Sequence, residues 1–99
     1  MDDVLLSKVR LAIVMELLAA DWVSFSELGR ATEVTAGNLA THLARLVEAG
    51  YVKERKSFHG RRPLTTYHLT AAGKRALTSH ADWLARMVAP IRPAASETA

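Results

Sequence analysis

The sequence predicts a mainly α domain with a small β-hairpin, of the α+β class, and three observations lead to this fold. Leucines at helical spacing mark a helix over residues 35–49. Directly after it, residues 51–69 are rich in β-branched and aromatic residues around a turn that contains Gly60 and Pro63, which is typical of a hairpin. Two longer helical patterns flank this centre, over residues 4–20 and 71–89.

The first helical pattern carries two apolar stripes. One consists of Leu5, Leu6, Val9, Ile13 and Leu17. The other, on the far side, consists of Val4, Leu11, Val14, Met15 and Leu18. A surface helix usually has one stripe, so this helix is expected to be covered on both sides. A partner subunit is one cover, and a central position within its own domain is the alternative.

A short strand at residues 22–25 and a short helix at 27–33 are expected next. Ser26 is one candidate for the N-cap of that helix, and Ser24 with Glu27 in a capping box is the other. Two short helices joined by a brief turn, the second with small and polar residues on one face, form a helix-turn-helix arrangement.

The central helix has two different faces. Leu39, Leu43 and Leu46 share the apolar face, and Gly50 stands where a helix end needs a residue that tolerates positive φ. The opposite face consists of small and polar residues, namely Gly37, Ala40, Thr41, Ala44 and Glu48, with Asn38 and Arg45 on one flank. Such a face suits close approach to a nucleic acid, although it would also suit solvent.

The hairpin, about 51–69, is strongly basic. Val52 and Phe58 are expected to point inward. The positive side chains are Lys53, Arg55 and Lys56 on the first strand and His59, Arg61 and Arg62 at the tip. Charges on an exposed strand also prevent edge-to-edge pairing, but this cluster is denser than that role needs. We therefore expect phosphate contacts.

The last helix, 71–89, is expected to begin after the N-cap Thr70 and to end before Pro90. Its apolar residues cover nearly half of its circumference, which again suggests an interface or a ligand cleft. Residues 1–90 are expected to form one domain, and residues 91–99 a disordered tail.

Composition restricts the function. The chain has 99 residues and no cysteine, which excludes disulfides, thiolate metal sites and a nucleophilic thiol. No apolar run is long enough to cross a membrane and no signal peptide is recognisable, so a cytoplasmic protein is expected. Residues 1–33 hold three basic and six acidic residues, whereas residues 34–75 hold eight basic and two acidic ones. This asymmetry is typical of a protein that binds a polyanion.

A set of short motifs carries a family resemblance. They are Gly37-Asn-Leu-Ala-Thr-His-Leu43, Glu48-Ala-Gly-Tyr-Val52, Gly60-Arg-Arg-Pro63 and Leu69-Thr-Ala-Ala-Gly-Lys-Arg-Ala-Leu77. In this order and spacing, the chain to about residue 89 resembles the winged helix-turn-helix domains of bacterial transcription regulators. It is most similar to small single-domain proteins allied to the MarR and ArsR types.

The resemblance implies that helix 35–49 is a recognition helix in the major groove and that the hairpin is the wing. The groove-facing positions would be Thr35, Ala36, Asn38, Thr41 and Arg45. The wing contacts to DNA would come from Lys53, Arg55, Lys56, His59, Arg61 and Arg62. It also implies a homodimer joined through the first and last helices, with interface residues Leu11, Met15, Leu18, Trp83, Leu84 and Met87.

The expected function is sequence-specific binding of double-stranded DNA by a transcriptional regulator, a homodimeric repressor acting on a pseudo-palindromic operator. The alternative is a winged helix that binds an acidic protein partner. An enzyme is not expected, because His42, His80, Ser79 and Asp82 lack the spacing of a nucleophile, its base and an orienting group. No cofactor and no metal are expected, since the four histidines show no ligand spacing. A small-molecule effector between the subunits would also be compatible with the apolar surplus.

Overall fold

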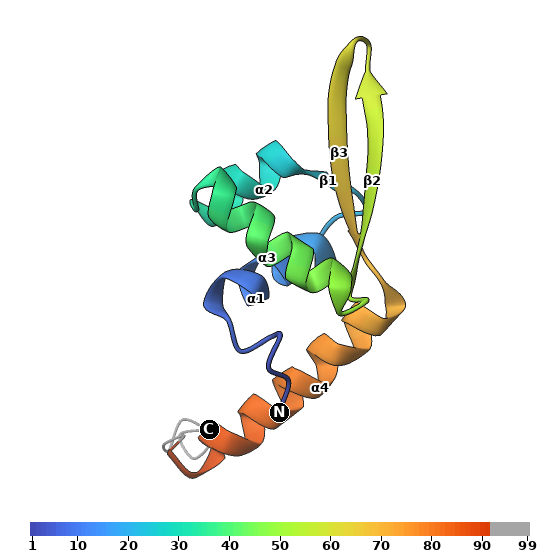
Figure 1. The fold of residues 1–99 in the computed structure, drawn as a ribbon. Coiled ribbons are helices and arrows are strands. Elements are labelled where there is room, and N and C mark those ends of the chain that lie inside the picture. Colours follow the sequence, from blue (N-terminus) through green and yellow to red (C-terminus); the bar gives the residue numbers. More distant parts are fainter. Residues whose placement is uncertain (92–99) are drawn as a thin grey trace.

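A computed structural model describes residues 1–91 of the chain. It contains four helices and three strands in the predicted order (Figure 1). In chain order they are α1 (Lys8–Leu18), β1 (Val23–Ser24), α2 (Phe25–Thr32), α3 (Ala36–Glu48), β2 (Val52–His59), β3 (Arg62–Leu69), α4 (Ala71–Val88) and a short 3₁₀ turn (Ala89–Ile91). The predicted α+β fold is confirmed.

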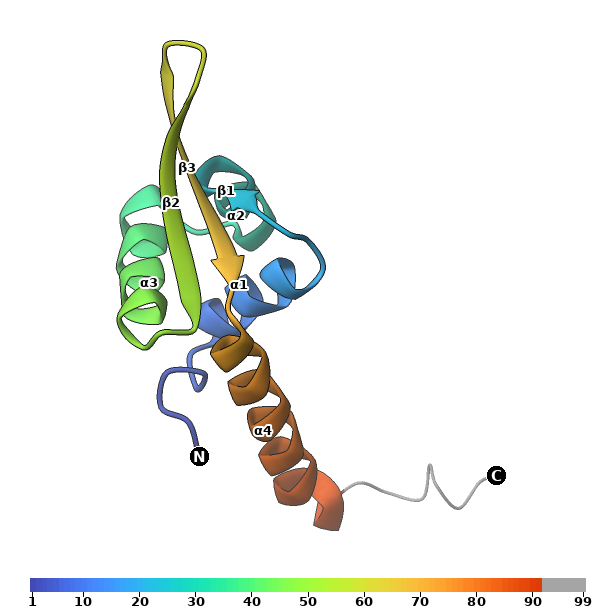
Figure 2. The ribbon, with the colours of Figure 1, turned by 90° about the vertical axis from the view of Figure 1, so that its right-hand side faces the viewer.

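The strands form one antiparallel sheet in the order β1-β3-β2. Val23 pairs with Tyr67 on one edge, while the long β2–β3 hairpin pairs from Val52 with Leu69 out to His59 with Arg62. The outer part of the hairpin projects beyond the helices, and α4 leaves the body in the opposite direction (Figures 1 and 2). The molecule is therefore elongated, with extents of 58 × 23 × 23 Å.

The hydrophobic core lies where α1, α2, α3 and the inner half of the sheet meet. Its most deeply buried side chains are Leu5, Ile13, Val14, Leu17, Leu28, Leu39, Leu43, Leu46 and Leu69. The three leucines predicted to share a face of the central helix are all in this set. Burial of each such side chain contributes about 1.5–3 kcal/mol relative to exposure, so this cluster orients α3 within the domain.

The first helix is shorter than the predicted 4–20. Ser7 caps its N-terminus by accepting a hydrogen bond from the Arg10 backbone N–H at 3.2 Å. The preceding residues form turns in which the Asp2 carboxylate accepts from the Val4 N–H at 3.0 Å. Local capping by Asp2 and Ser7 competes with helix propagation, which the apolar periodicity alone does not reveal.

The second stripe of the first helix was predicted to be covered as one surface, and the structure divides it. Val14 lies in the core, whereas Met15 and Leu18 are exposed, with Met15 52% accessible. Leu6, assigned to the first stripe, is also exposed. Leu6 precedes Lys8 and lies in the turns before α1, so it does not have the position that a continuous helix would give it.

Ser24, not Ser26, caps the second helix. Its side chain accepts from the Glu27 N–H at 3.1 Å and donates to the Glu27 carboxylate at 3.0 Å. The first of the two predicted alternatives is therefore wrong and the Ser24–Glu27 pair is right. The helix ends at Glu33, whose left-handed backbone (φ 55°) makes the tight turn into α3.

Gly50 has the positive φ value that the sequence predicts, 80°, and Gly60, in the predicted turn, has a φ of 65°. They allow the chain to leave α3 and to reverse at the hairpin tip. Phe58 contradicts its prediction, because it is 72% exposed instead of pointing inward. Val52, at the other end of the same strand, is buried as expected.

Thr70 caps α4 as predicted, accepting from the Gly73 N–H at 3.0 Å. The first turns of α4 pack on the core through Gly73, Ala76 and Leu77. The helix ends one residue earlier than predicted, and Ile91, assigned by sequence to the tail, closes the 3₁₀ turn. The rest of the predicted tail, residues 92–99, lies outside the described residues. No helix within residues 1–91 has the length and apolar character to cross a membrane.

Candidate nucleic-acid interface

The five residues predicted to face the major groove lie together on the outer side of α3. Thr35, Ala36, Asn38, Thr41 and Arg45 are all exposed. The buried leucines hold the opposite side of the helix against the core, so the outer side has no cover within the described chain. The five residues are therefore accessible together, and their contact with DNA stays a prediction.

Two threonine hydroxyls of this surface are already used within the helix. Thr35, the N-cap, accepts from the Asn38 N–H at 3.2 Å, and Thr41 donates to the Gly37 carbonyl at 3.1 Å. The Thr41 bond fixes its rotamer, which leaves its methyl group for apolar contact. Arg45 pairs weakly with Glu48, at 3.6 Å, in an exposed position. Such a pair contributes little and releases the guanidinium easily.

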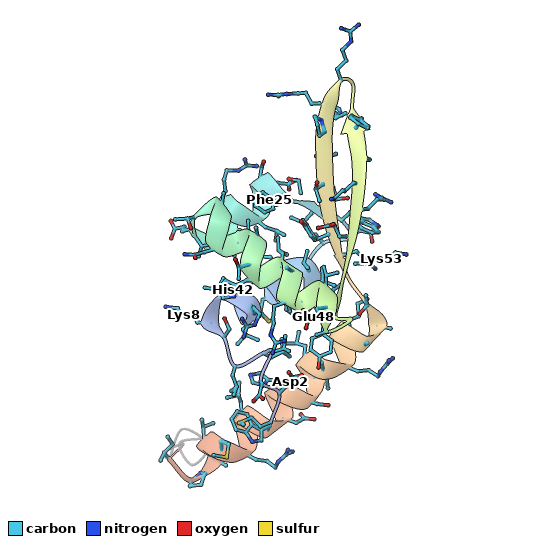
Figure 3. The ribbon with its side chains drawn as sticks, viewed as in Figure 1. Asp2, Lys8, Phe25, His42, Glu48 and Lys53 are labelled. Carbon is cyan, nitrogen blue, oxygen red and sulfur yellow. The ribbon has the colours of Figure 1, made fainter. Side chains whose placement is uncertain are left out.

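His42 joins α3 to α1 on the side away from this surface (Figure 3). The Arg10 guanidinium donates to His42 Nδ1 at 3.1 Å and to the Val4 carbonyl at 2.6 Å. Because arginine can only donate, His42 must accept at Nδ1 and carry its proton on Nε2. His42 is half-buried, and its contact with Arg10 helps to orient α3.

The positive residues of the wing do not all lie on one face of the hairpin. Side chains alternate along a strand, and Lys56 lines a cavity shared with Phe25 and Tyr67 on the α2 side of the sheet. Lys53 and Arg55 are an odd number of positions from Lys56 along β2, so their side chains lie on the other side of the sheet. Figure 3 shows Lys53 pointing away from α3.

Arg55 is held against the back of the sheet by an aromatic stack. Its guanidinium carbon lies 4.0 Å from the centroid of the Trp22 ring. Trp22 in turn stacks on His68 with centroids 4.9 Å apart, and His68 Nδ1 lies 2.7 Å from the Asp21 carbonyl oxygen. The sequence analysis did not find this Arg55–Trp22–His68 stack, because it joins residues more than thirty positions apart.

His59, Arg61 and Arg62 remain together and exposed at the tip of the wing. His59 pairs with Arg62 across the hairpin, and Gly60 and Arg61 form the turn between them. Together with Ser26, Pro63 and Leu64 they border a shallow cavity of about 500 Å³. The tip therefore carries positive charge out beyond the body of the domain.

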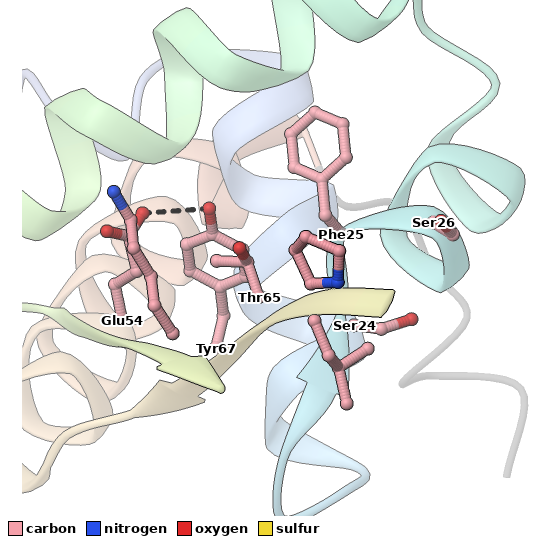
Figure 4. Close-up of a pocket in the computed structure, with 9 residues that line it drawn as sticks. Ser24, Phe25, Ser26, Glu54, Thr65 and Tyr67 are labelled. Carbon is pink, nitrogen blue, oxygen red and sulfur yellow. Dashed lines mark hydrogen bonds between the residues drawn. The ribbon is translucent and has the colours of Figure 1, made fainter. Parts of the chain in front are cut away.

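A second cavity, of about 450 Å³, lies between the start of α2 and the wing (Figure 4). Across its floor the Tyr67 hydroxyl donates to Glu54 at 2.9 Å. Burial, followed by this hydrogen bond to Glu54, raises the pKa of Tyr67 well above the ordinary tyrosine value. The bond holds Glu54, the one acidic side chain among residues 53–62, against Tyr67, although Glu54 itself is exposed.

Tyr51 and Tyr67 are expected to lose their phenol protons at higher pH in the folded chain than in the unfolded chain. Tyr51 donates to Asp2 at 2.6 Å, and this bond raises its pKa above 10.0. Since both folded pKa values are raised, the protonated phenols stabilise the fold below pH 10.0, and this contribution is lost as the pH rises above it. Tyrosinate absorbance should therefore appear at higher pH in native protein than in urea. A Tyr51→Phe variant isolates Tyr67, and identical native and denatured titrations would contradict the two hydrogen bonds.

The residues predicted for a dimer interface lie mostly on the surface of α1 and on the far half of α4. Met15, Leu18, Leu84 and Met87 are exposed, with Met87 59% accessible. Leu11 and Trp83 are half-buried, and Trp83 stacks on the buried His80 with ring centroids 5.6 Å apart. The helix α1 belongs to the body of the domain, whereas the far half of α4 lies at the end of the molecule away from the wing tip (Figure 1).

No cluster of three or more potential metal ligands occurs within the described part of the chain.

Comparison with known proteins places these features in a family. The family model described as a winged helix DNA-binding domain matches residues 9–88. No curated protein sequence is significantly similar to the chain. Among solved structures, a transcriptional regulator homologue from Pyrococcus horikoshii OT3 superposes with a TM-score of 0.83 at 28% identity, covering 91% of this chain and 89% of that one.

Two further structures share the fold at lower identity. A MarR-family regulator from Porphyromonas gingivalis W83 has a TM-score of 0.67 at 24% identity, over 84% of this chain and 79% of that one. Bacillus subtilis PadR, solved in complex with operator DNA, has a TM-score of 0.67 at 21% identity, over 79% of this chain and 48% of that one. With its helix-turn-helix, its basic hairpin and a family match over 80 of its residues, the chain belongs to the winged helix DNA-binding domain family of transcriptional regulators.

Proposed function

We propose that this protein is a sequence-specific repressor that binds double-stranded DNA as a homodimer on a pseudo-palindromic operator. One observation carries the proposal: the exposed polar face of α3 and the basic tip of the wing belong to one body, while apolar side chains of α1 and of the far half of α4 remain exposed. PadR, which shares the fold, is a protein solved with its operator DNA.

In this proposal α3 lies in the major groove. Asn38 pairs with an adenine edge, the Thr41 methyl contacts a thymine methyl, and Arg45 leaves Glu48 to bind a phosphate. Thr35 and Ala36 stand at the N-terminal end of the helix, where the partial positive charge of the helix favours a phosphate oxygen. The small residues Gly37 and Ala40 allow the backbone to approach closely.

The wing supplies the contacts that depend mostly on charge. His59, Arg61 and Arg62 at the tip contact phosphates or enter a narrow minor groove, and Lys56 contacts the strand that passes between the wing and α2. Lys53 adds a long-range positive potential from the other face of β2. Arg55, engaged with Trp22, has a structural role instead.

The homodimer forms through α1 and α4. Met15, Leu18 and Met87 are exposed, and Leu11 and Trp83 are half-buried. Exposed apolar side chains on two helices favour an interaction site, and a two-fold axis there makes the same residues face each other in both subunits. In this proposal the dimer represses by covering the promoter.

Selection from a randomised pool of duplex DNA, at near-physiological salt, tests the proposal. Enrichment of an inverted repeat would support dimeric, specific recognition, and the half-site spacing would report the distance between the two α3 helices. If only weak, salt-sensitive binding without an enriched sequence is found, specific recognition is wrong. Pull-down with acidic peptides then tests the alternative, a protein-binding winged helix, which is favoured by the small number of base-reading side chains on α3.

Asn38→Ala is expected to relax sequence preference at about one or two base pairs of each half-site, because one bidentate contact to adenine contributes about 1–3 kcal/mol of discrimination. Repeating the selection with the variant measures this directly. Ser79→Ala, an exposed polar change on α4, is the control and should leave the selected sequence unchanged. An unaltered preference in the Asn38 variant would remove this residue from the base-reading set.

A further inference from the structure

Phe58 has no cover in the structure. Among the phenylalanine, tyrosine and tryptophan side chains of residues 1–91, it is the one classed as exposed, at 72%. Its partner across the hairpin is Pro63, which is also exposed. Phe58 and Pro63 form an exposed apolar pair just below the tip of the wing. Because this large apolar ring is exposed to water, covering it with a partner lowers the free energy.

The dimer interface does not provide that cover. Phe58 stands near the outer end of β2, where the hairpin projects beyond the helices, whereas the far half of α4 lies at the opposite end of a molecule 58 Å long (Figure 1). Along β2, Phe58 alternates in step with Lys56, which lines the cavity beside the start of α2. The ring is therefore on the α2 side of the wing and not on the side of the Arg55–Trp22–His68 stack.

The surroundings of the ring define the chemistry of its partner. The Phe58–Pro63 pair is flanked by the basic residues Lys56, His59, Arg61 and Arg62. The nearby Glu54 is hydrogen-bonded to Tyr67. The partner must therefore present negative charge at its edges and an apolar surface between them. A DNA duplex has this arrangement, because its phosphates border a groove whose floor is the edge of stacked bases.

We propose that Phe58 is a wedge that enters the minor groove at one base step and partly unstacks it. The proposal rests on the proposed DNA binding, and it adds a way in which the wing selects sequence. Pyrimidine–purine steps unstack more easily than others, so the wedge favours a TA or CA step at a fixed distance from the half-site that α3 reads. The arginines at the tip hold the phosphates on either side while the ring is inserted.

Fluorescence of 2-aminopurine tests the wedge, because this base brightens when it is unstacked. The probe is the duplex enriched by selection, with 2-aminopurine replacing each adenine in turn. Wild-type protein should brighten one position outside the α3 half-site. Phe58→Ala should abolish the brightening and weaken binding about ten- to a hundredfold, the range for losing one base–aromatic contact. Phe58→Tyr, which keeps the ring, should preserve both.

Two further readouts separate a wedge from a structural or a charge effect. The thermal unfolding midpoint of Phe58→Ala should equal that of wild type, because the side chain is exposed. The dependence of log K on log salt should also be unchanged, because no charge is removed. Equal affinity of wild type and Phe58→Ala, or a wild-type complex without any brightened position, overturns the wedge while leaving DNA binding intact. Absence of wild-type binding to any duplex overturns both proposals.

Discussion

Gly73→Ala is expected to lower the free energy of unfolding by about 2–3 kcal/mol, the size of an overpacked core substitution. A Cβ at Gly73 would lie 2.3 Å from the Tyr51 carbonyl oxygen and 2.5 Å from Leu69 Cδ1. The oxygen belongs to the backbone and already accepts a hydrogen bond from the Thr70 N–H at 2.9 Å, so it cannot move aside cheaply. The first turn of α4 would have to separate from the loop that follows α3.

Gly37→Ala provides a matched control for this prediction. Gly37 is likewise in the first turn of a helix, but a Cβ there would meet nothing within 4 Å. The same chemical change should therefore raise the free energy of unfolding, by up to about 1 kcal/mol, through helix propensity. Urea denaturation of both variants at one protein concentration measures the difference. Destabilisation of equal size in both would show that the close approach at Gly73 is not the cause.

Arg61→Ala combined with Arg62→Ala is expected to weaken binding to every duplex about ten- to a hundredfold at near-physiological salt, because two phosphate contacts are lost. The slope of log K against log salt should fall by about 2. Both side chains are exposed, so the thermal unfolding midpoint should not change. Titration of a labelled duplex at several salt concentrations measures both effects.

The control for this pair removes the same charge elsewhere. Lys74→Ala with Arg75→Ala takes two exposed positive side chains from α4, at a distance from the wing tip. If net charge alone attracts the DNA, both double variants should lose affinity equally. If the wing touches the phosphates, only the tip variant should lose the salt slope. A tip variant that binds as tightly as wild type at every salt concentration would contradict the wing contacts.

Some features near the site could be predicted from the sequence because they depend only on local structure. The exposure of Asn38, Thr41 and Arg45 follows from one helix whose other face carries three leucines, and that periodicity is visible within fifteen residues. Thr70 as an N-cap, Gly50 as a positive-φ residue and Gly60 as a turn residue are likewise decided by the chain within a few positions. Caps and turns follow from hydrogen bonds and sterics between near neighbours, and so could be read directly.

The charge cluster of the wing was harder to interpret because composition does not give side-chain direction. Residues 53–62 contain five lysine or arginine side chains, but pairing in register sends Lys53 and Arg55 to one face and Lys56 to the other. Trp22, distant in sequence, then captures Arg55. The inward prediction for Phe58 failed for the same reason: the hairpin extends beyond the helices, so its outer end has no core to face.

By itself, the sequence determined the order of the elements, the faces of α3, the turns and the concentration of positive charge on one half of the chain. These features depend on periodicity, on local hydrogen bonds and on composition. Only the tertiary structure decided that Phe58 is exposed on the wing and that Arg55 is stacked on Trp22. It also decided which apolar residues of α1 are buried and how closely α4 approaches Tyr51. These depend on contacts between residues far apart in the chain, whose geometry is set when the helices and the sheet pack together.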